Sequence, residues 1–251
     1  MDDCRPRTNE MQKTLVEPLQ AIFSCNLSIM NQQMFVGGLM TDSWTKNMSF
    51  SMESFRDCKR HDNVARCVQP LIEKCRQSGI VAVKVIRLHM SYVGQLLSSD
   101  PDLRLIHVVR DPRGTVESWR KVADKGSTSM TNMRLYAKLI CQRMLTDCQI
   151  RRQLELKYTR RILLLRYEDL VTATDTVLND VYSGLLQLAL PSNVVDVIKK
   201  RLHATADNGA WGTLRTNGTA TATNWRRTIN SELLNYTTDT CRQLLAELRY
   251  N

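Results

Sequence analysis

The chain has 251 residues, enough for a sizeable core, and 43% of them are hydrophobic, which excludes an intrinsically disordered protein. Lys and Arg number 35 against 25 Asp and Glu, and the net charge of +10 favours an anionic partner such as nucleic acid, acidic glycan, anionic lipid or a phosphorylated cofactor. No apolar run reaches the roughly 20 residues of a membrane-spanning helix, and no signal peptide is visible.

The first hundred residues show helical periods and one apolar run. We expect a polar, disordered start at residues 1–13, and a folded domain over residues 14–251. In chain order we predict a helix at 14–24, an irregular surface segment at 31–66, a helix at 68–78 with Gly79 as its C-cap, a buried strand at 80–86 and a helix at 91–98. The strand prediction depends on IVAVKVI, a short run rich in β-branched residues.

From residue 103 onward, apolar strands alternate with helices. In chain order we predict a buried strand at 103–109, helices at 111–122 and 130–157, a buried strand at 161–168, helices at 174–190 and 192–203, a loop at 204–224 and an amphipathic helix at 230–249. This alternation is typical of a parallel sheet covered on both faces. The predicted fold class is therefore α/β, with a single domain and a parallel sheet flanked by helices.

The eight cysteines contain no C-x-x-C pair, so neither a zinc ribbon nor a thioredoxin motif is expected. We expect some of them to form disulfides. Cys141 and Cys148 lie about two turns apart on one predicted helix, roughly 10 Å. Because this exceeds the Cα–Cα reach of a disulfide, these two are not expected to pair with each other.

Asparagine sequons give a first indication of compartment. Four sites read N-x-S/T, and they are Asn26, Asn47, Asn217 and Asn235. Chance supplies about one or two in a chain of this length, so four favour a secreted or lumenal protein. Coincidence in a Thr- and Asn-rich sequence is the alternative. A natural N-terminus with a membrane anchor, preceding this chain, would reconcile the sequons with the missing signal segment.

The strand end at residue 109 is the strongest candidate for a ligand site. LRLIHVV leads directly into Arg110-Asp111-Pro112-Arg113, and the following helix carries Ser118 and Arg120. Ligands of parallel α/β sheets bind at the carboxyl ends of the strands. Two guanidinium groups beside a helix N-terminus predict an anion site there. The alternative is an ordinary strand–helix turn with solvated arginines.

The same segment, LIHVVRDPRGTVESWR, resembles the 3′-phosphate-binding segment of sulfotransferases, which use the sulfate donor PAPS. More narrowly, it is similar to the Golgi carbohydrate 6-O-sulfotransferases, whose acceptors are galactose, N-acetylglucosamine or N-acetylgalactosamine. Other stretches agree in the same order, and they are CNLSIM at 25–30, CRQSGIVAVKVIRL at 75–88, LLLRYEDL at 163–170 and NWRRTI at 224–229. The resemblance covers about residues 20–250 and implies a P-loop-type sulfotransferase fold.

The resemblance also implies roles for individual residues. Arg110 and Ser118 are expected to bind the 3′-phosphate of PAPS, and Arg113 to support the loop. Lys84 and Arg87 are expected to face the cleft as catalytic candidates, where positive charge steadies the transferred sulfuryl group or an acidic glycan. Their alternative interpretation is a solvated strand end.

Of three further groups, one is expected at the nucleotide and two are expected to be structural. Trp225 and Arg226 close over the nucleotide, unless the tryptophan is a packing anchor. The segment Tyr167-Glu168-Asp169 is expected to be structural, with carboxylates that cap the next helix. His107 is expected to point to the core or to a neighbouring helix, not to serve as a base. The family uses no metal.

The implied function is PAPS-dependent transfer of a sulfuryl group to the 6-hydroxyl of a sugar in a keratan- or chondroitin-type glycan. The implied location is the Golgi lumen, and the full-length form would be a type II membrane protein. The family's Arg-Ser-Gly-Ser-Ser loop for the 5′-phosphosulfate is not found, so we expect the chain to begin after it. An inactive homologue that binds nucleotide or acidic glycan is the alternative.

Two classes outside the family are also weighed. Only 6% of residues are aromatic and no helix-turn-helix segment appears, so a nucleic-acid partner is not expected. A P-loop kinase would need G-x-x-x-x-G-K-[ST], which is absent from the sequence.

Overall fold

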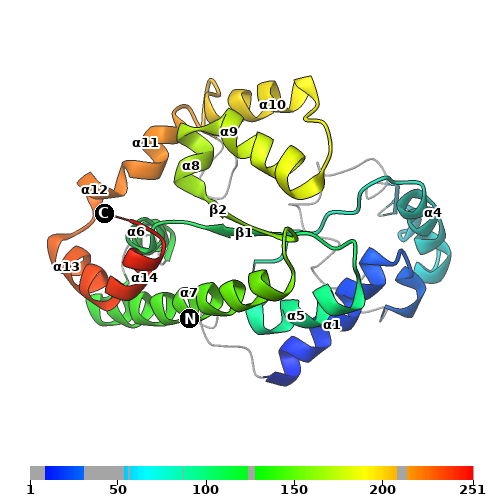
Figure 1. Cartoon of the computed structure of the whole chain (residues 1–251), viewed down its shortest axis with the longest axis horizontal. Helices are drawn as coiled ribbons and strands as arrows, with labels where there is room; N and C mark the ends of the chain where they lie inside the picture. The colour runs from blue at the N-terminus through cyan, green and yellow to red at the C-terminus, as the bar shows by residue number, and fades with distance from the viewer. Residues whose placement is uncertain are drawn as a thin grey trace. The chain divides into compact units, whose positions relative to one another are not determined.

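The computed structural model describes residues 9–30, 54–55, 57–86, 88–123, 128–207 and 214–250, and the side chains from residue 16 onward. The fold is α/β, mainly helical, with a small parallel sheet (Figure 1). By its internal contacts the chain divides into one compact unit from Pro6 to Leu96 and another that contains Leu97–Asn251. Within the described residues, no helix is both long and apolar enough to cross a membrane.

The unit that ends at Leu96 is built from helices. Its elements are α1 (Asn9–Phe23), the short 3₁₀ helix η2 (Leu27–Ile29), α4 (Val64–Arg76) and most of α5 (Met90–Ser99). Its core consists of Ala21, Leu27, Met30, Phe55, Cys67, Val68, Leu71 and Ile72. Two disulfides, Cys25–Cys75 and Cys58–Cys67, join segments around this core. The expectation that some cysteines pair is therefore confirmed.

Helix ends in this unit differ from the sequence prediction. Helix α1 begins at Asn9, inside the stretch 1–13 that was expected to be disordered, and the buried Val16 and Leu19 anchor its second half. Helix α4 begins at Val64, four residues early, because the Asn63 side chain accepts the Arg66 N–H as an N-cap. It ends at Arg76 with Gln77 as C-cap, so the expected cap at Gly79 is wrong. The segment expected to be irregular was 31–66, of which residues 31–53 lie outside the described residues, whereas residues 54–55 and 57–58 are helical.

The strand predicted at residues 80–86 is not formed. These residues are described as irregular chain, and Ile80 and Ile86 are 56% and 71% exposed. A strand of a parallel sheet is stabilised by burial on both faces, which these side chains do not have. The prediction of burial is also too strong for the next strand, since Val109 is buried there while Val108 is 60% exposed.

The unit beyond Leu96 contains the sheet. Its elements after α5 are β1 (Leu105–Val109), α6 (Pro112–Val122), α7 (Met130–Lys157), β2 (Ile162–Arg166), α8 (Tyr167–Thr172), α9 (Thr174–Asn179), the π-helix η5 (Asp180–Leu186), α10 (Ser192–Leu202), α11 (Gly218–Thr223), α12 (Trp225–Thr228), α13 (Ser231–Thr240) and α14 (Arg242–Glu247). Strands β1 and β2 pair in parallel, in register from Leu105↔Ile162 to Val109↔Arg166. In Figure 1, α7 runs along one side of this pair, and α8 and α9 lie on the other.

Local signals explain where several of these helices begin. Asp111 accepts the Arg113 N–H and Pro112 occupies the first position of α6, as the sequence predicts. The Ser129 side chain caps α7, and the Asn230 side chain caps α13 by accepting two N–H groups. Because Asp111 closely follows β1, its cap fixes the helix that begins at the carboxyl end of that strand.

Two clusters form the core around the sheet. On the α7 side, Val109 packs with Cys141, Cys148, Cys241 and residues of α14. On the other side, Leu165 packs with Val177 and Val181. A disulfide joins Cys141 to Cys241, whereas Cys148 is buried and unpaired among the described residues. The expectation that Cys141 and Cys148 do not pair is confirmed, because both lie on the unbroken helix α7.

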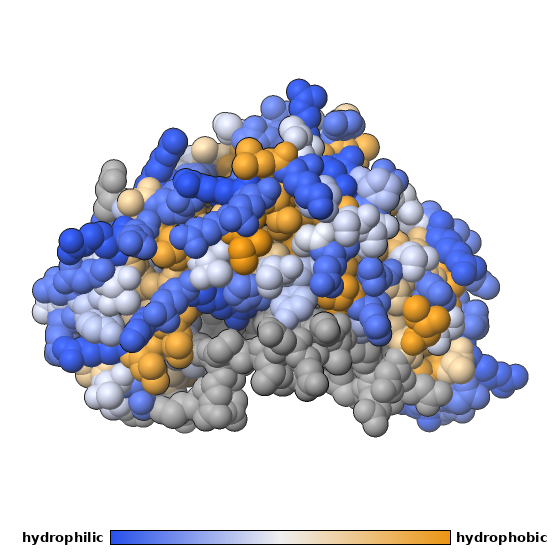
Figure 2. All heavy atoms as spheres, turned by 60° about the horizontal axis from the view of Figure 1, so that its bottom comes forward, coloured by the Kyte–Doolittle hydropathy of each residue, from blue (hydrophilic) through white to orange (hydrophobic). Residues whose placement is uncertain are grey.

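The last third of the chain is more segmented than predicted. The helix expected at 174–190 is α9 followed by η5, which ends before Gln187 at φ 56°. The loop expected at 204–224 contains α11, because Asn217 caps it by accepting the Ala220 N–H. The closing helix expected at 230–249 breaks at the disulfide-bonded Cys241 into α13 and α14. Over the described residues, the face drawn in Figure 2 is largely hydrophilic, with small separate hydrophobic patches.

Candidate functional site

The register of the two strands brings the two sequence motifs together. Because Val109 pairs with Arg166, the next residues of both strands also meet at the carboxyl edge. The Arg110 guanidinium lies 5.2 Å from the centre of the Tyr167 ring. One residue further, the Asp111 N–H donates to Oε1 of Glu168 at 3.0 Å. The RDPR and RYED segments therefore form one site, at the sheet edge where α/β proteins bind ligands.

One donor of Arg110 has no acceptor among the residues that the structure describes. Its side chain is half-buried, and Nη2 donates to the carbonyl of Thr221 at 3.3 Å. Its Nε is buried and finds no hydrogen-bond acceptor among the described residues. A buried charged donor without an acceptor is costly, so this atom fits an anionic ligand.

Arg113 is oriented differently from the solvated arginine of the alternative interpretation. Its Nε and Nη2 donate to the two carboxylate oxygens of Asp111 at 3.0 and 2.8 Å, and the residue is 7% exposed. This bidentate pair is enclosed by protein, and Asp111 also caps α6. Arg113 therefore braces the turn from inside, and the second guanidinium predicted at the strand end is already paired.

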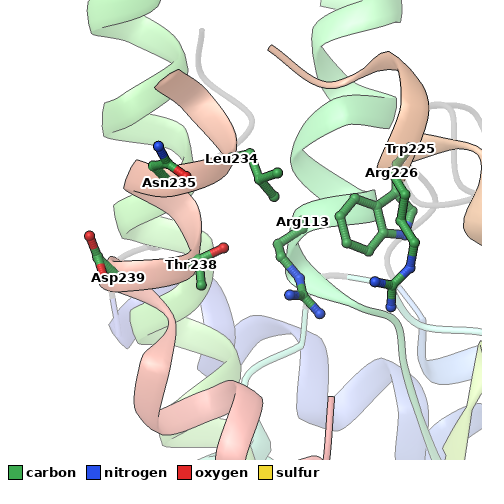
Figure 3. Close-up of a pocket in the computed structure, with 7 residues that line it drawn as sticks. All are labelled: Arg113, Trp225, Arg226, Leu234, Asn235, Thr238 and Asp239. Carbon is green, nitrogen blue, oxygen red and sulfur yellow. The ribbon is translucent and has the colours of Figure 1, made fainter. Parts of the chain in front are cut away.

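Trp225 is held between two arginines. Its ring centre lies 4.8 Å from the Arg113 guanidinium and 4.7 Å from that of Arg226, and Figure 3 shows the indole between them. The indole is 5% exposed, and Gly114 of α6 packs directly against it. A pocket of about 500 Å³ opens beside this stack. It is lined by Arg113, Trp225, Arg226, Leu234, Asn235, Thr238 and Asp239.

Two other predicted residues are described, and both are exposed. Ser118 is exposed on α6, about two turns from the Asp111 cap, and makes no hydrogen bond within the described part of the chain. Lys84 is exposed in the irregular segment 80–86 of the other unit. Arg87 lies outside the described residues.

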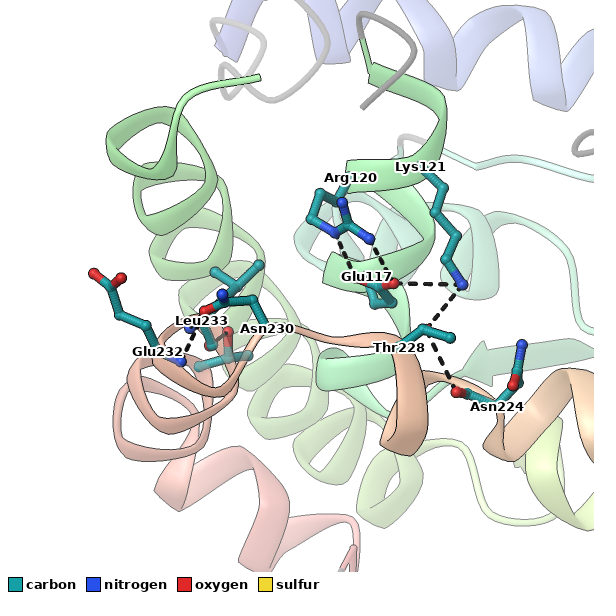
Figure 4. A network of polar contacts seen from close by, with 9 residues as sticks. Glu117, Arg120, Lys121, Asn224, Thr228, Asn230, Glu232 and Leu233 are labelled. Atoms are coloured by element: carbon teal, nitrogen blue, oxygen red, sulfur yellow. Dashed lines mark hydrogen bonds and ion pairs between the residues drawn. The ribbon is translucent and has the colours of Figure 1, made fainter. Parts of the chain in front are cut away.

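A buried carboxylate that the sequence interpretation missed joins α6 to α12. Glu117 is 1% exposed and accepts from Arg120 at 2.7 and 3.0 Å, while Lys121 lies 3.4 Å away and donates to Thr228 (Figure 4). Burial raises the pKa of the Glu117 carboxyl, but hydrogen bonds from Arg120 and Thr228 and the charges of Arg120 and Lys121 outweigh it, so the pKa is lowered. The sequence signal was a glutamate followed by Arg and Lys at positions i+3 and i+4.

Two other polar residues meet their expectations in part. Glu168 does not cap α8 as expected, since it accepts from Asp111 and from the hydroxyl of Tyr250. No sequence pattern indicated Tyr250.

His107 is half-buried, and burial, followed by the charge of Arg151 on α7, lowers its pKa to about 4. Its Nδ1 is buried, in agreement with the expectation that it points to the core or to a neighbouring helix.

The sequons and possible metal ligands are described only in part. Asn26, Asn217 and Asn235 are exposed, and Asn47 lies outside the described residues. Asn235 also lines the pocket beside Trp225. Among the described side chains, no group of three or more His, Cys, Asp or Glu is placed to hold a metal ion.

The fold and this strand end define an α/β protein with a cluster of arginines at the carboxyl edge of a parallel sheet. The model of the Sulfotransferase family matches residues 18–188, more than half of the chain, and the chain belongs to this family. No solved structure matches it.

Curated relatives refine this assignment. The chain is 29% identical over 194 residues to carbohydrate sulfotransferase 1 of Danio rerio, covering 71% of this chain and 46% of that protein. It is 28% identical over 197 residues to carbohydrate sulfotransferase 1 of Homo sapiens, with the same coverage. It is 29% identical over 181 residues to carbohydrate sulfotransferase 3 of Rattus norvegicus, covering 64% and 37%. The chain thus spans less than half the length of these relatives.

Proposed function

We propose that the chain is the nucleotide-binding part of a carbohydrate sulfotransferase, which transfers a sulfuryl group to the 6-hydroxyl of a sugar in a keratan- or chondroitin-type glycan. The observation that carries this proposal is the anion site at Arg110, formed by two joined strand ends in a member of the sulfotransferase family. The names of the curated relatives support a carbohydrate acceptor.

The residues at the strand end fit the donor PAPS, which supplies the sulfuryl group. The Nε of Arg110, which has no acceptor among the described residues, is the proposed donor for its 3′-phosphate. The exposed hydroxyl of Ser118, about two turns along α6, is the second proposed donor. Arg113 keeps the turn in shape through Asp111. Trp225 and Arg226, in the wall of the adjacent pocket, cover the nucleotide.

The acceptor side is a glycan bound by positive charge. Lys84 and Arg87 are the catalytic candidates, because cations stabilise the charge that develops as the sulfuryl group moves between oxygens. Positioning and electrostatics carry most of such a transfer, by analogy with phosphoryl transfer. The proposed location is the Golgi lumen, and the exposed sequons and three disulfides support an oxidising, glycosylating compartment.

Calorimetry of two nucleotides tests the proposal. PAP carries a 3′-phosphate and AMP does not, so the unmutated chain should bind PAP more tightly. Charge-assisted hydrogen bonds contribute about 1.5–3 kcal/mol each, so Arg110→Ala should weaken the binding of PAP by roughly 10- to 150-fold. Ser118→Ala should weaken PAP binding less than Arg110→Ala does. The affinity for AMP should change little in both variants.

The matched control removes an arginine from the opposite end of the same strand. Arg104 precedes β1, and its guanidinium donates to backbone carbonyls there. Arg104→Ala loses the same charge and should leave the preference for PAP intact. Equal binding of PAP and AMP, or equal weakening of both by Arg110→Ala, would show that this strand end is not a 3′-phosphate site.

A further inference from the structure

One carboxylate joins three segments that are far apart in sequence. Glu168 is the second residue of α8, directly after β2. Its Oε1 accepts the Asp111 N–H at 3.0 Å, and its Oε2 accepts the Tyr250 hydroxyl at 2.7 Å. The start of α6 and the end of the chain are thus held by the same side chain.

The Tyr250 hydroxyl has little freedom to turn away from Glu168. The residue is 8% exposed, and the Arg166 guanidinium lies 4.3 Å from its ring centre. Its N–H donates to the carbonyl of Leu245, and Arg166 reaches the carbonyl of Arg249. Burial, and then the hydrogen bond to Glu168, raise the pKa of Tyr250 well above its usual range. The hydroxyl therefore remains a donor at neutral pH.

Asp111 transmits this constraint to the anion site. It is 2% exposed, its side chain is occupied by Arg113, and its N–H belongs to the peptide that links it to Arg110. Among the described residues, a 3.3 Å hydrogen bond to Thr221 and the contact with the Tyr167 ring are what orient Arg110. The direction of the Arg110 guanidinium consequently depends on how that peptide is held.

We propose that Glu168 and Tyr250 are positioning residues, which hold the Arg110–Asp111 peptide in the orientation that a 3′-phosphate requires. This inference depends on the proposed function of Arg110. Neither residue touches the ligand; both act through the Asp111 N–H. Tyr250, the next-to-last residue of the given sequence, thereby becomes part of the nucleotide site, although nothing in its sequence context indicates it.

The test measures the ratio of PAP to AMP affinity by calorimetry on the full 251-residue chain. Tyr250→Phe keeps the ring over Arg166 and removes only the hydroxyl, so the ratio should fall roughly 3- to 10-fold. Glu168→Ala removes both hydrogen bonds and should lower it further. Glu168→Gln retains an oxygen for the Asp111 N–H, so its ratio of PAP to AMP affinity should stay within about twofold of that of the unmutated chain.

Two additional measurements separate positioning from general stability. Tyr182→Phe removes a hydroxyl near the Leu165 cluster and should leave the ratio unchanged, whatever it does to thermal unfolding. In the Glu168→Ala background, Tyr250→Phe should cost much less than it does alone, because both act through one hydrogen-bonded unit.

The outcomes distinguish this inference from the function on which it rests. If Arg110→Ala leaves the preference for PAP over AMP unchanged, the proposed function and the positioning role are both overturned. If Arg110→Ala abolishes the preference while Tyr250→Phe and Glu168→Ala only lower the unfolding temperature, the positioning role is overturned and the proposed function stands. Independent, additive effects of Tyr250→Phe and Glu168→Ala would also overturn the positioning role.

Discussion

A single absent methyl group determines how closely Trp225 lies against α6. A Cβ at Gly114 would be 2.8 Å from Cδ1 and 3.1 Å from Nε1 of the indole. The indole cannot retreat easily, because arginines lie over it and it is almost fully buried. Gly114 therefore has a packing role in a helix, where glycine is otherwise unfavourable.

Gly114→Ala should destabilise the protein. Alanine improves helix propensity by about 1 kcal/mol, but overpacking a filled site costs about 1–3 kcal/mol, so we expect a net loss of roughly 1 kcal/mol in chemical denaturation. Gly184→Ala is the matched control, because a Cβ there meets nothing within 4 Å. A Gly114→Ala variant as stable as Gly184→Ala would mean that the indole is loosely packed.

At the scale of elements, strand β1 carries an uncharged histidine, His107, near Arg151 of α7. Burial and the nearby Arg151 lower the pKa of His107 to about 4, from a usual value of 6.5. Below pH 6.5 the unfolded chain binds a proton at this site that the folded chain does not. The stability that the neutral histidine allows is therefore fully present above about pH 6.5 and is lost as the pH falls towards 4.

Replacing His107 should flatten this part of the pH dependence. The unmutated chain should lose at most about 3 kcal/mol at this site between about pH 6.5 and 4, and His107→Leu should lose correspondingly less. His203→Leu, at an exposed histidine, serves as the control. Denaturation at about pH 7 and pH 4.5 measures the difference, and identical pH dependences of His107→Leu and the unmutated chain would contradict the assigned burial.

Elements with local signals could be predicted from sequence, and those that depend on distant partners could not. Asp111 and Pro112 define the start of α6 by themselves, and buried apolar residues recur at helical spacing along α7 at Met133, Ala137, Cys141 and Cys148. The run at 80–86 shows the limit, because composition predicts a strand but burial decides whether one forms. For the same reason Arg110 was identified from its motif, whereas the Glu168–Tyr250 contact across 82 positions was not.

At the scale of the whole molecule, three disulfides constrain the described chain. Two lie within the unit that ends at Leu96, and the third, Cys141–Cys241, spans 100 positions in the other. In the chain-entropy model, the loss of stability on removing a disulfide increases with the loop it closes. The three bonds should therefore differ in their contribution to stability.

Removing the long-range bond should cost more than removing the short one. For loops of these lengths the model gives about 4.7 kcal/mol for Cys141→Ala/Cys241→Ala and about 2.6 kcal/mol for Cys58→Ala/Cys67→Ala, whose cysteines are nine positions apart. Free energies of unfolding from denaturant titration measure both. The reverse order would show that native packing, not loop closure, determines these stabilities.

The Cys141–Cys241 bond also links the holding of Tyr250 to disulfide formation. Cys241 lies immediately before α14, the helix that leads to Tyr250, and the bond fastens this end of the chain to α7. A molecule synthesised under reducing conditions would keep both strands and Arg110, yet its C-terminal tyrosine would be less firmly held. Under the proposed function, copies that have not formed this bond should therefore prefer PAP over AMP less strongly than oxidised copies do.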